Sequence, residues 1–113
     1  MAQENIIIKL TFDFSLKIIS FCELLEKEKK YNLSNQLFRA GTSIGANVRE
    51  SQGAESKLDF IHKMKIAYKE AEETKYWLEL CNHSDSYPDT SDLLKEVESI
   101  LKVIGKIISS AKS

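Results

Sequence analysis

Proline and glycine are scarce in this sequence, which has one proline and four glycines among its 113 residues. Because these two residue types mark most tight turns, their scarcity disfavours a fold of many short strands. An excess of one charge is also missing, since 16 Lys and Arg residues stand against 17 Asp and Glu. Domains that hold nucleic acid by bulk charge usually carry a clear positive excess. The balance therefore argues against bulk electrostatic binding of nucleic acid as the main task.

Long apolar runs and clusters of cysteine are missing as well. A membrane-spanning helix needs about 20 consecutive apolar residues, and no stretch of this sequence approaches that length. Lys9 and Asp13 interrupt the apolar run that begins with Ile6–Ile8, and we expect that run to be too short for a signal-peptide core. Cys22 and Cys81 are the only cysteines, too few for a zinc site or a disulfide framework. We expect two reduced core thiols, no membrane partner and a cytoplasmic location.

What the sequence does contain is apolar side chains that return every three or four residues in four segments. This periodicity is typical of helices with one buried face, and it predicts helices over about residues 4–27, 33–52, 57–82 and 91–110. Since the connections between them are short, consecutive helices should be antiparallel. We therefore predict an all-α, antiparallel up-down-up-down four-helix bundle that forms a single domain over residues 1–113.

Local signals mark the end of the second helix and the start and seam of the third. Gly53 lies where a helix C-terminal glycine often lies. Ser56–Asp59 resembles a capping box in which Asp replaces the usual Glu. The seam predicted to face the core follows a heptad pattern, and its members are Phe60, Met64, Ala67, Ala71, Thr74, Leu78 and Cys81.

The first helix is apolar over a wider arc than one core-facing stripe requires. The stripe expected to face the core consists of Ile7, Phe14, Ile18, Phe21 and Leu25. A second stripe lies beside it and consists of Ile8, Phe12, Leu16 and Ile19. The surplus predicts that this second stripe meets another chain.

The second helix is unusual because much of its surface is small or polar. Polar groups brought into a helix contact must find hydrogen-bond partners, since an unpaired group costs ~1–3 kcal/mol. We expect Arg39 or Arg49 to pair with carboxylates of the third helix, within a chain or between chains. The predicted structural or interfacial network consists of Arg39, Ser43, Asn47, Arg49, Glu50, Glu70 and Glu73. A solvated surface, or a ligand or nucleic-acid site built on the arginines, remains an alternative.

Catalytic patterns are weak in this chain. Gly41–Gly45 matches G-x-S-x-G, but no strand precedes it as a nucleophile elbow requires, so small residues that permit close helix packing are the better interpretation. Asp59–His62 is one partial match to the carboxylate and histidine pairs of a di-iron bundle, which needs two such pairs. We assign no catalytic residue, no metal ligand and no cofactor.

Three stretches resemble a known family. They are Leu37–Ser51 (LFRAGTSIGANVRES), Phe12–Ile19 (FDFSLKII) and Lys65–Leu78 (KIAYKEAEETKYWL). Together they resemble the bacterial four-helix bundle family of 23S rRNA intervening-sequence proteins, which is related to the accessory variability determinant of diversity-generating retroelements. The resemblance implies a homopentameric ring. The related accessory variability determinant binds RNA and a reverse transcriptase. The positions that match the family signature are Arg39, Ser43, Asn47, Glu50 and Glu73, read as structural or interfacial.

These observations lead to one preferred function and two alternatives. We expect a non-enzymatic bundle that self-assembles, through the resemblance as a pentamer, and acts as an interaction or scaffold protein. One alternative is an RNA-binding accessory protein linked to ribosomal RNA or to a reverse transcriptase. The other is a metal-dependent enzyme. The sequence leaves the identity of any RNA or protein partner open.

Overall fold

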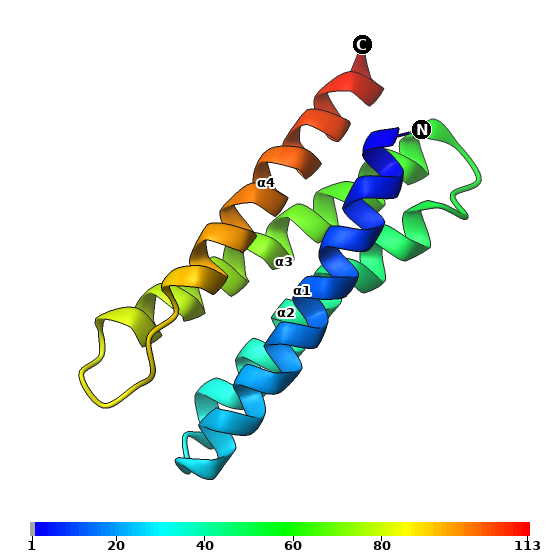
Figure 1. The fold of residues 1–113 in the computed structure, drawn as a ribbon. Helices are drawn as coiled ribbons and strands as arrows, with labels where there is room; N and C mark the ends of the chain where they lie inside the picture. The colour runs from blue at the N-terminus through cyan, green and yellow to red at the C-terminus, as the bar shows by residue number, and fades with distance from the viewer. Residues whose placement is uncertain (1) are drawn as a thin grey trace.

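The computed structural model describes residues 2–113, with side chains from residue 6 onward. It contains four helices, α1 (Ala2–Lys27), α2 (Tyr31–Ser51), α3 (Lys57–His83) and α4 (Ser91–Lys112), arranged as a rod of 45 × 20 × 19 Å (Figure 1). Each end lies within two residues of its predicted position. The prediction of an all-α antiparallel bundle is confirmed. Along residues 2–113, no helix combines the length and the apolar character that crossing a bilayer demands.

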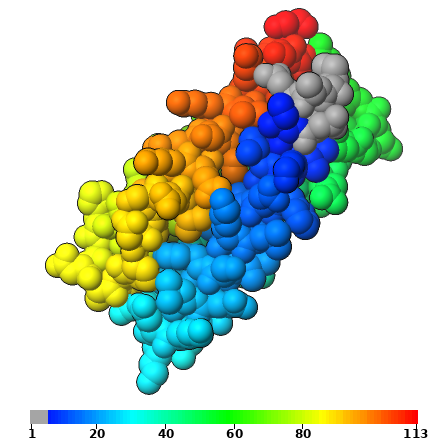
Figure 2. All heavy atoms as spheres, viewed as in Figure 1, coloured from blue at the N-terminus to red at the C-terminus, as the bar shows by residue number. Residues whose placement is uncertain are grey.

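Each helix packs against two others. α2 contacts α1 and α3, α4 contacts α3 and closes the bundle against α1, and the pairs α1–α3 and α2–α4 are diagonal. Figure 2 shows α1 and α4 lying against each other along one face. Ion pairs join helices at the edges of this packing, with Lys17 Nζ 2.6 Å from Glu96 Oε1 and Lys75 Nζ 3.4 Å from Glu98 Oε2.

The core consists of apolar side chains from all four helices. Thr11 and Thr74 also lie inside it, and each donates its hydroxyl at 2.7 Å to the carbonyl four residues earlier, which leaves neither hydroxyl unpaired. The largest fully buried side chains are Ile7, Phe14, Ile18, Leu25, Leu37, Ile44, Val48, Met64, Leu78, Val97, Ile100 and Ile104.

Two glycines of α2 let α1 approach closely. A Cβ at Gly41 would lie 2.9 Å from two side-chain carbons of Ile18, and one at Gly45 would lie 3.2 Å from the Thr11 carbonyl oxygen. The hydroxyl of Ser43 donates to the Arg39 carbonyl at 2.5 Å within the helix. The Gly41–Gly45 stretch thus supports close helix packing, as its small residues predict.

The turn between α1 and α2 has a left-handed residue that is not glycine. Lys29 adopts φ 62°. The Lys30 N–H donates to the Leu25 carbonyl at 2.8 Å, and the Lys29 N–H donates to the Glu26 carbonyl at 2.9 Å. This is the Schellman arrangement, in which glycine usually occupies the left-handed position. The turn therefore has a local backbone cost that glycine would remove.

Several local predictions need correction. Gly53 is not a left-handed cap, because α2 ends at Ser51 with Gln52 in the right-handed region and no glycine among residues 2–113 has positive φ. In the α3 seam, Ile61 is buried in place of the half-buried Phe60. The capping box at Ser56 forms in part, since its hydroxyl accepts from the Asp59 N–H at 3.0 Å.

Candidate interaction surfaces

The second apolar stripe of α1 is exposed along a groove. Phe12 and Leu16 are 53% and 51% exposed, and Ile8 and Ile19 are half-buried beside them. They line one wall of a groove of about 420 Å³ between α1 and α2. We call this the α1/α2 groove, and its lining consists of Ile8, Thr11, Phe12, Ser15, Leu16, Ile19, Phe38, Thr42, Gly45, Ala46 and Arg49.

The groove exists because α2 presents small side chains opposite large ones on α1. Gly45 and Ala46 add little volume, so the rings and branches of α1 stand above them rather than meeting a matching wall. Phe38, itself exposed, adds a further aromatic ring to the α2 wall. Single exposed apolar residues are ordinary, but a contiguous apolar groove indicates an interaction site. That this stripe meets another chain stays a prediction.

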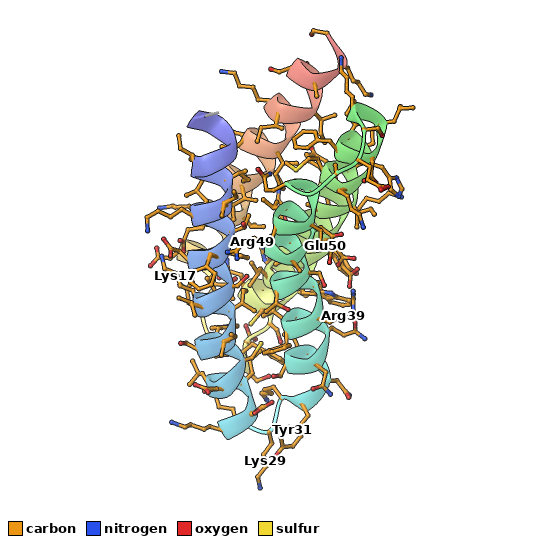
Figure 3. The ribbon with its side chains drawn as sticks, turned by 90° about the vertical axis from the view of Figure 1, so that its right-hand side faces the viewer. Lys17, Lys29, Tyr31, Arg39, Arg49 and Glu50 are labelled. Atoms are coloured by element: carbon orange, nitrogen blue, oxygen red, sulfur yellow. The ribbon has the colours of Figure 1, made fainter. Side chains whose placement is uncertain are left out.

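Of the described residues that line the groove, Arg49 is the one that carries a charge. Figure 3 shows it on the α1 side of α2. Its guanidinium carbon lies 5.9 Å from the centroid of the Phe12 ring, within the range of a cation–π contact. Among the side chains of residues 6–113, no carboxylate lies within 4.0 Å of it. The expected alternative of pairing Arg49 with Glu70 or Glu73 is therefore not realised within the chain.

Arg39 makes that pairing instead, on the other side of α2. Its Nη1 lies 3.3 Å from Glu70 Oε1, and its Nη2 pairs with Glu73 Oε2. Trp77 Nε1 donates to the same Glu73 oxygen at 2.9 Å. The Trp77 hydrogen bond, followed by the hydrogen bond and charge of Arg39, lowers the pKa of Glu73 against the opposing effect of burial. This cluster ties α2 to α3 and keeps Glu73 ionised.

The remaining members of the predicted network do not join it. The Asn47 amide donates to the Ser43 carbonyl at 2.9 Å, and Ser43 in turn bonds to its own helix. Glu50 pairs with Lys63 at 3.1 Å, further along the α2–α3 contact. Within one chain the seven predicted residues thus form separate contacts, and their role in an interface between chains stays a prediction. The sequence reasoning also missed Lys63 and Trp77 as partners.

α3 carries a second exposed apolar patch with free carboxylates. Tyr76 and Leu80 are 54% and 45% exposed. Glu72 lies one turn before Tyr76 and Glu79 lies one turn after it, both exposed. Neither carboxylate forms an ion pair with a side chain among residues 6–113. We call these four residues the α3 patch; the Trp77 ring borders it, 5.3 Å from the Tyr76 ring between centroids.

The two thiols are buried and hydrogen-bonded. Cys22 Sγ donates to the Ser34 carbonyl at 3.4 Å, and Cys81 Sγ donates to the Pro88 carbonyl at 3.3 Å. Burial raises the pKa of Cys22 and raises the pKa of Cys81 to about 11. Both cysteines therefore stay protonated near neutral pH, and thiols in this state are poor nucleophiles and poor metal ligands. Within the described residues, no three His, Cys, Asp or Glu side chains gather as they would around a metal ion.

Comparisons with known proteins agree with the resemblance noted in the sequence. The family model described as "23S rRNA-intervening sequence protein" matches residues 3–109. A solved structure, a protein of unknown function from the S23 ribosomal protein family of Bacteroides thetaiotaomicron, is 36% identical and superimposes with a TM-score of 0.90. That match covers 95% of this chain and 98% of the other. No curated protein matches this chain.

Proposed function

Because the chain belongs to the 23S rRNA-intervening sequence protein family, we propose that it is a non-enzymatic bundle that self-assembles and serves as an interaction or scaffold protein. The α1/α2 groove is the surface through which it assembles. A homopentameric ring, which the family resemblance implies, is the form that we adopt for the assembly. Two buried free thiols suit a reducing compartment, so we place the protein in the cytoplasm.

The exposure of Phe12 and Leu16 is the observation that supports this proposal. Full burial of such a side chain stabilises by roughly 1.5–3 kcal/mol, so covering each half-exposed side chain would contribute about 1 kcal/mol. The neighbouring Phe38 and the half-buried Ile8 and Ile19 extend the same surface. A second macromolecule seated along the whole groove would cover all five at once. This apolar area favours assembly without any change in the bundle itself.

The test is the mass of the full chain in solution, measured by light scattering behind a sizing column. We expect several times the 12.9 kDa of one chain. Leu16→Glu, which places a charge in the groove, should reduce the mass to that of a monomer. Leu24→Glu is the matched control, because Leu24 is also exposed on α1 but does not line the groove. A wild-type protein that runs as a monomer at all accessible concentrations would contradict the proposal.

RNA binding is a second candidate, favoured by the contact between Arg49 and Phe12. A guanidinium beside an exposed aromatic face is an arrangement on which bases stack in single-stranded nucleic acid complexes. The near-neutral charge of the chain places this candidate second. Filter binding of structured RNA should show retention that falls steeply with added salt if this function holds. Absence of retention at low salt would remove it.

A further inference from the structure

We propose that the α1/α2 groove of one copy receives the α3 patch of the next copy, whose carboxylate pairs with Arg49. The inference rests on the proposed self-assembly and names the two surfaces that meet. The groove is then incomplete within one chain, because its counter-charge comes from the neighbour. Three observations carry the inference: the charge of the groove, the composition of the α3 patch and the placement of both in the bundle.

The first observation is that no carboxylate lines the groove among the described side chains of residues 6–113. Its lining contains apolar side chains, the hydroxyls of Thr11, Ser15 and Thr42, and the guanidinium of Arg49. Two grooves packed face to face around a two-fold axis would bury apolar surface, but they would supply two guanidiniums and no acid from their linings. Desolvating a charge without a partner is costly. The groove therefore suits a surface that is apolar and acidic rather than a second groove.

The second observation is that the α3 patch has this composition. Tyr76 and Leu80 supply exposed apolar area, and Glu72 and Glu79 flank Tyr76 with carboxylates that have no ion pair among residues 6–113. Six other carboxylates of the bundle are held in ion pairs within the chain. Those in ion pairs are Asp13, Glu50, Glu70, Glu73, Glu96 and Glu98.

The third observation is that one chain cannot bring the two surfaces together. α1 and α3 are diagonal in the bundle, each packing against α2 and α4, so α2 separates the groove from the α3 patch. Figure 3 shows Arg49 on the α1 side of α2 and Arg39 and Glu50 on the opposite side. A contact between the two surfaces must therefore join different copies. Such a head-to-tail contact uses two different patches on each copy and closes into a ring when its rotation closes.

Mixing two blocked variants tests this arrangement. Leu16→Glu blocks the groove and leaves the α3 patch intact, and Tyr76→Glu blocks the patch and leaves the groove intact. We expect each variant alone to be a monomer with the circular dichroism spectrum of the wild type. Their equimolar mixture should form a species of two chains and no larger one, because one groove and one patch remain usable. Trp77, the one tryptophan of the chain and 5.3 Å from the Tyr76 ring, should change its emission on mixing.

The outcomes separate the inference from the proposed function. The inference is overturned if Tyr76→Glu assembles like the wild type and its mixture with Leu16→Glu yields no two-chain species. That result would show that grooves pair with each other or with another surface. A wild-type protein that is itself a monomer would remove both proposals. RNA retained through Arg49 with no effect of Tyr76→Glu on assembly would also count against the α3 patch.

Charge reversal provides a second test, which does not depend on the folding of the blocked variants. Arg49→Glu should weaken assembly by about tenfold or more, since it sets like charges against each other. Adding Glu72→Arg and Glu79→Arg to the same chain should recover most of that loss, because each contact then joins the reversed pair. Lys102→Glu, at an exposed position on α4, is the control and should have little effect. A loss that the reversed α3 charges fail to recover would overturn the assignment of this partner.

Discussion

Substituting alanine for two glycines should shift stability in opposite directions. Gly41 lies in the middle of α2 and Gly105 in the middle of α4, so both changes replace the poorest non-proline helix former by the best one. The space around them differs. A Cβ at Gly105 would meet its nearest atom, Tyr68 Cε2, at 3.7 Å, an ordinary contact, whereas a Cβ at Gly41 would lie 2.9 Å from two carbons of Ile18.

The magnitudes follow from these distances. Gly105→Ala should raise the free energy of unfolding by about 0.5–1 kcal/mol through the backbone alone. Gly41→Ala has the same gain, but Ile18 is fully buried and the clashing carbons lie next to its own Cβ, so the side chain cannot swing clear. Overpacking of this kind costs about 1–3 kcal/mol. We therefore expect Gly41→Ala to be less stable than Gly105→Ala by about 1–3 kcal/mol.

Urea denaturation followed by circular dichroism is the assay, at one fixed protein concentration because assembly adds to apparent stability. Combining Gly41→Ala with Ile18→Ala should cost less than the sum of the two single changes, since the truncated side chain makes room for the new methyl group. The reasoning is refuted if Gly41→Ala stabilises the protein as much as Gly105→Ala does. It is also refuted if the double variant shows additive losses.

Three shorter predictions concern the α1–α2 turn, Glu73 and the thiols. Lys29→Gly should stabilise the bundle by about 1 kcal/mol by removing a left-handed lysine, whereas Lys29→Ala should give no such gain in the same urea titration. The pKa of Glu73 is lowered in the folded chain by Trp77 and Arg39, so the stability that Glu73 contributes is present above the unfolded pKa and lost as pH falls through the folded pKa. Glu73→Gln should flatten that part of the acid dependence of the urea midpoint, and an unchanged slope would contradict the role of Trp77 and Arg39. The pKa of Cys81 is raised to about 11 and both cysteines are buried, so neither thiol should react with a disulfide reagent near neutral pH until urea is added. Rapid reaction of the native protein would contradict the burial of the two thiols.

The two arginines of α2 illustrate how far sequence reasoning reached in the candidate site. Both arginines stand on the polar part of the helix, and the sequence predicted that one or the other would meet carboxylates of the third helix. In the structure Arg39 meets Glu70 and Glu73, while Arg49 lies over Phe12. Periodicity places a residue on a face of its helix, but it does not reveal which neighbouring helix covers that face. The handedness with which four helices close into a bundle decides that.

Turn geometry escaped the sequence for a different reason. Glycine at position 53 suggested a left-handed cap. Among residues 2–113, however, the residue with positive φ is Lys29, in the connection before it. Propensities of single residues differ by about 1 kcal/mol, which is less than the burial of one large side chain. The packing of Leu25 in the core and the Schellman hydrogen bond to its carbonyl therefore set the turn, and the lysine accommodates it.

The number of helices, their ends to within two residues and most of the apolar stripe that each buries were determined by the sequence alone. These features depend on interactions between residues three or four apart, and the sequence displays such spacings directly. It also showed that α1 carries a second apolar stripe. Only the tertiary structure decided that this stripe borders an open groove. It also decided that, among the side chains of residues 6–113, Arg49 in the groove has no carboxylate partner and the carboxylates of Glu72 and Glu79 beside Tyr76 form no ion pair. Those facts depend on which helices become neighbours, a choice made by packing among residues far apart in the chain.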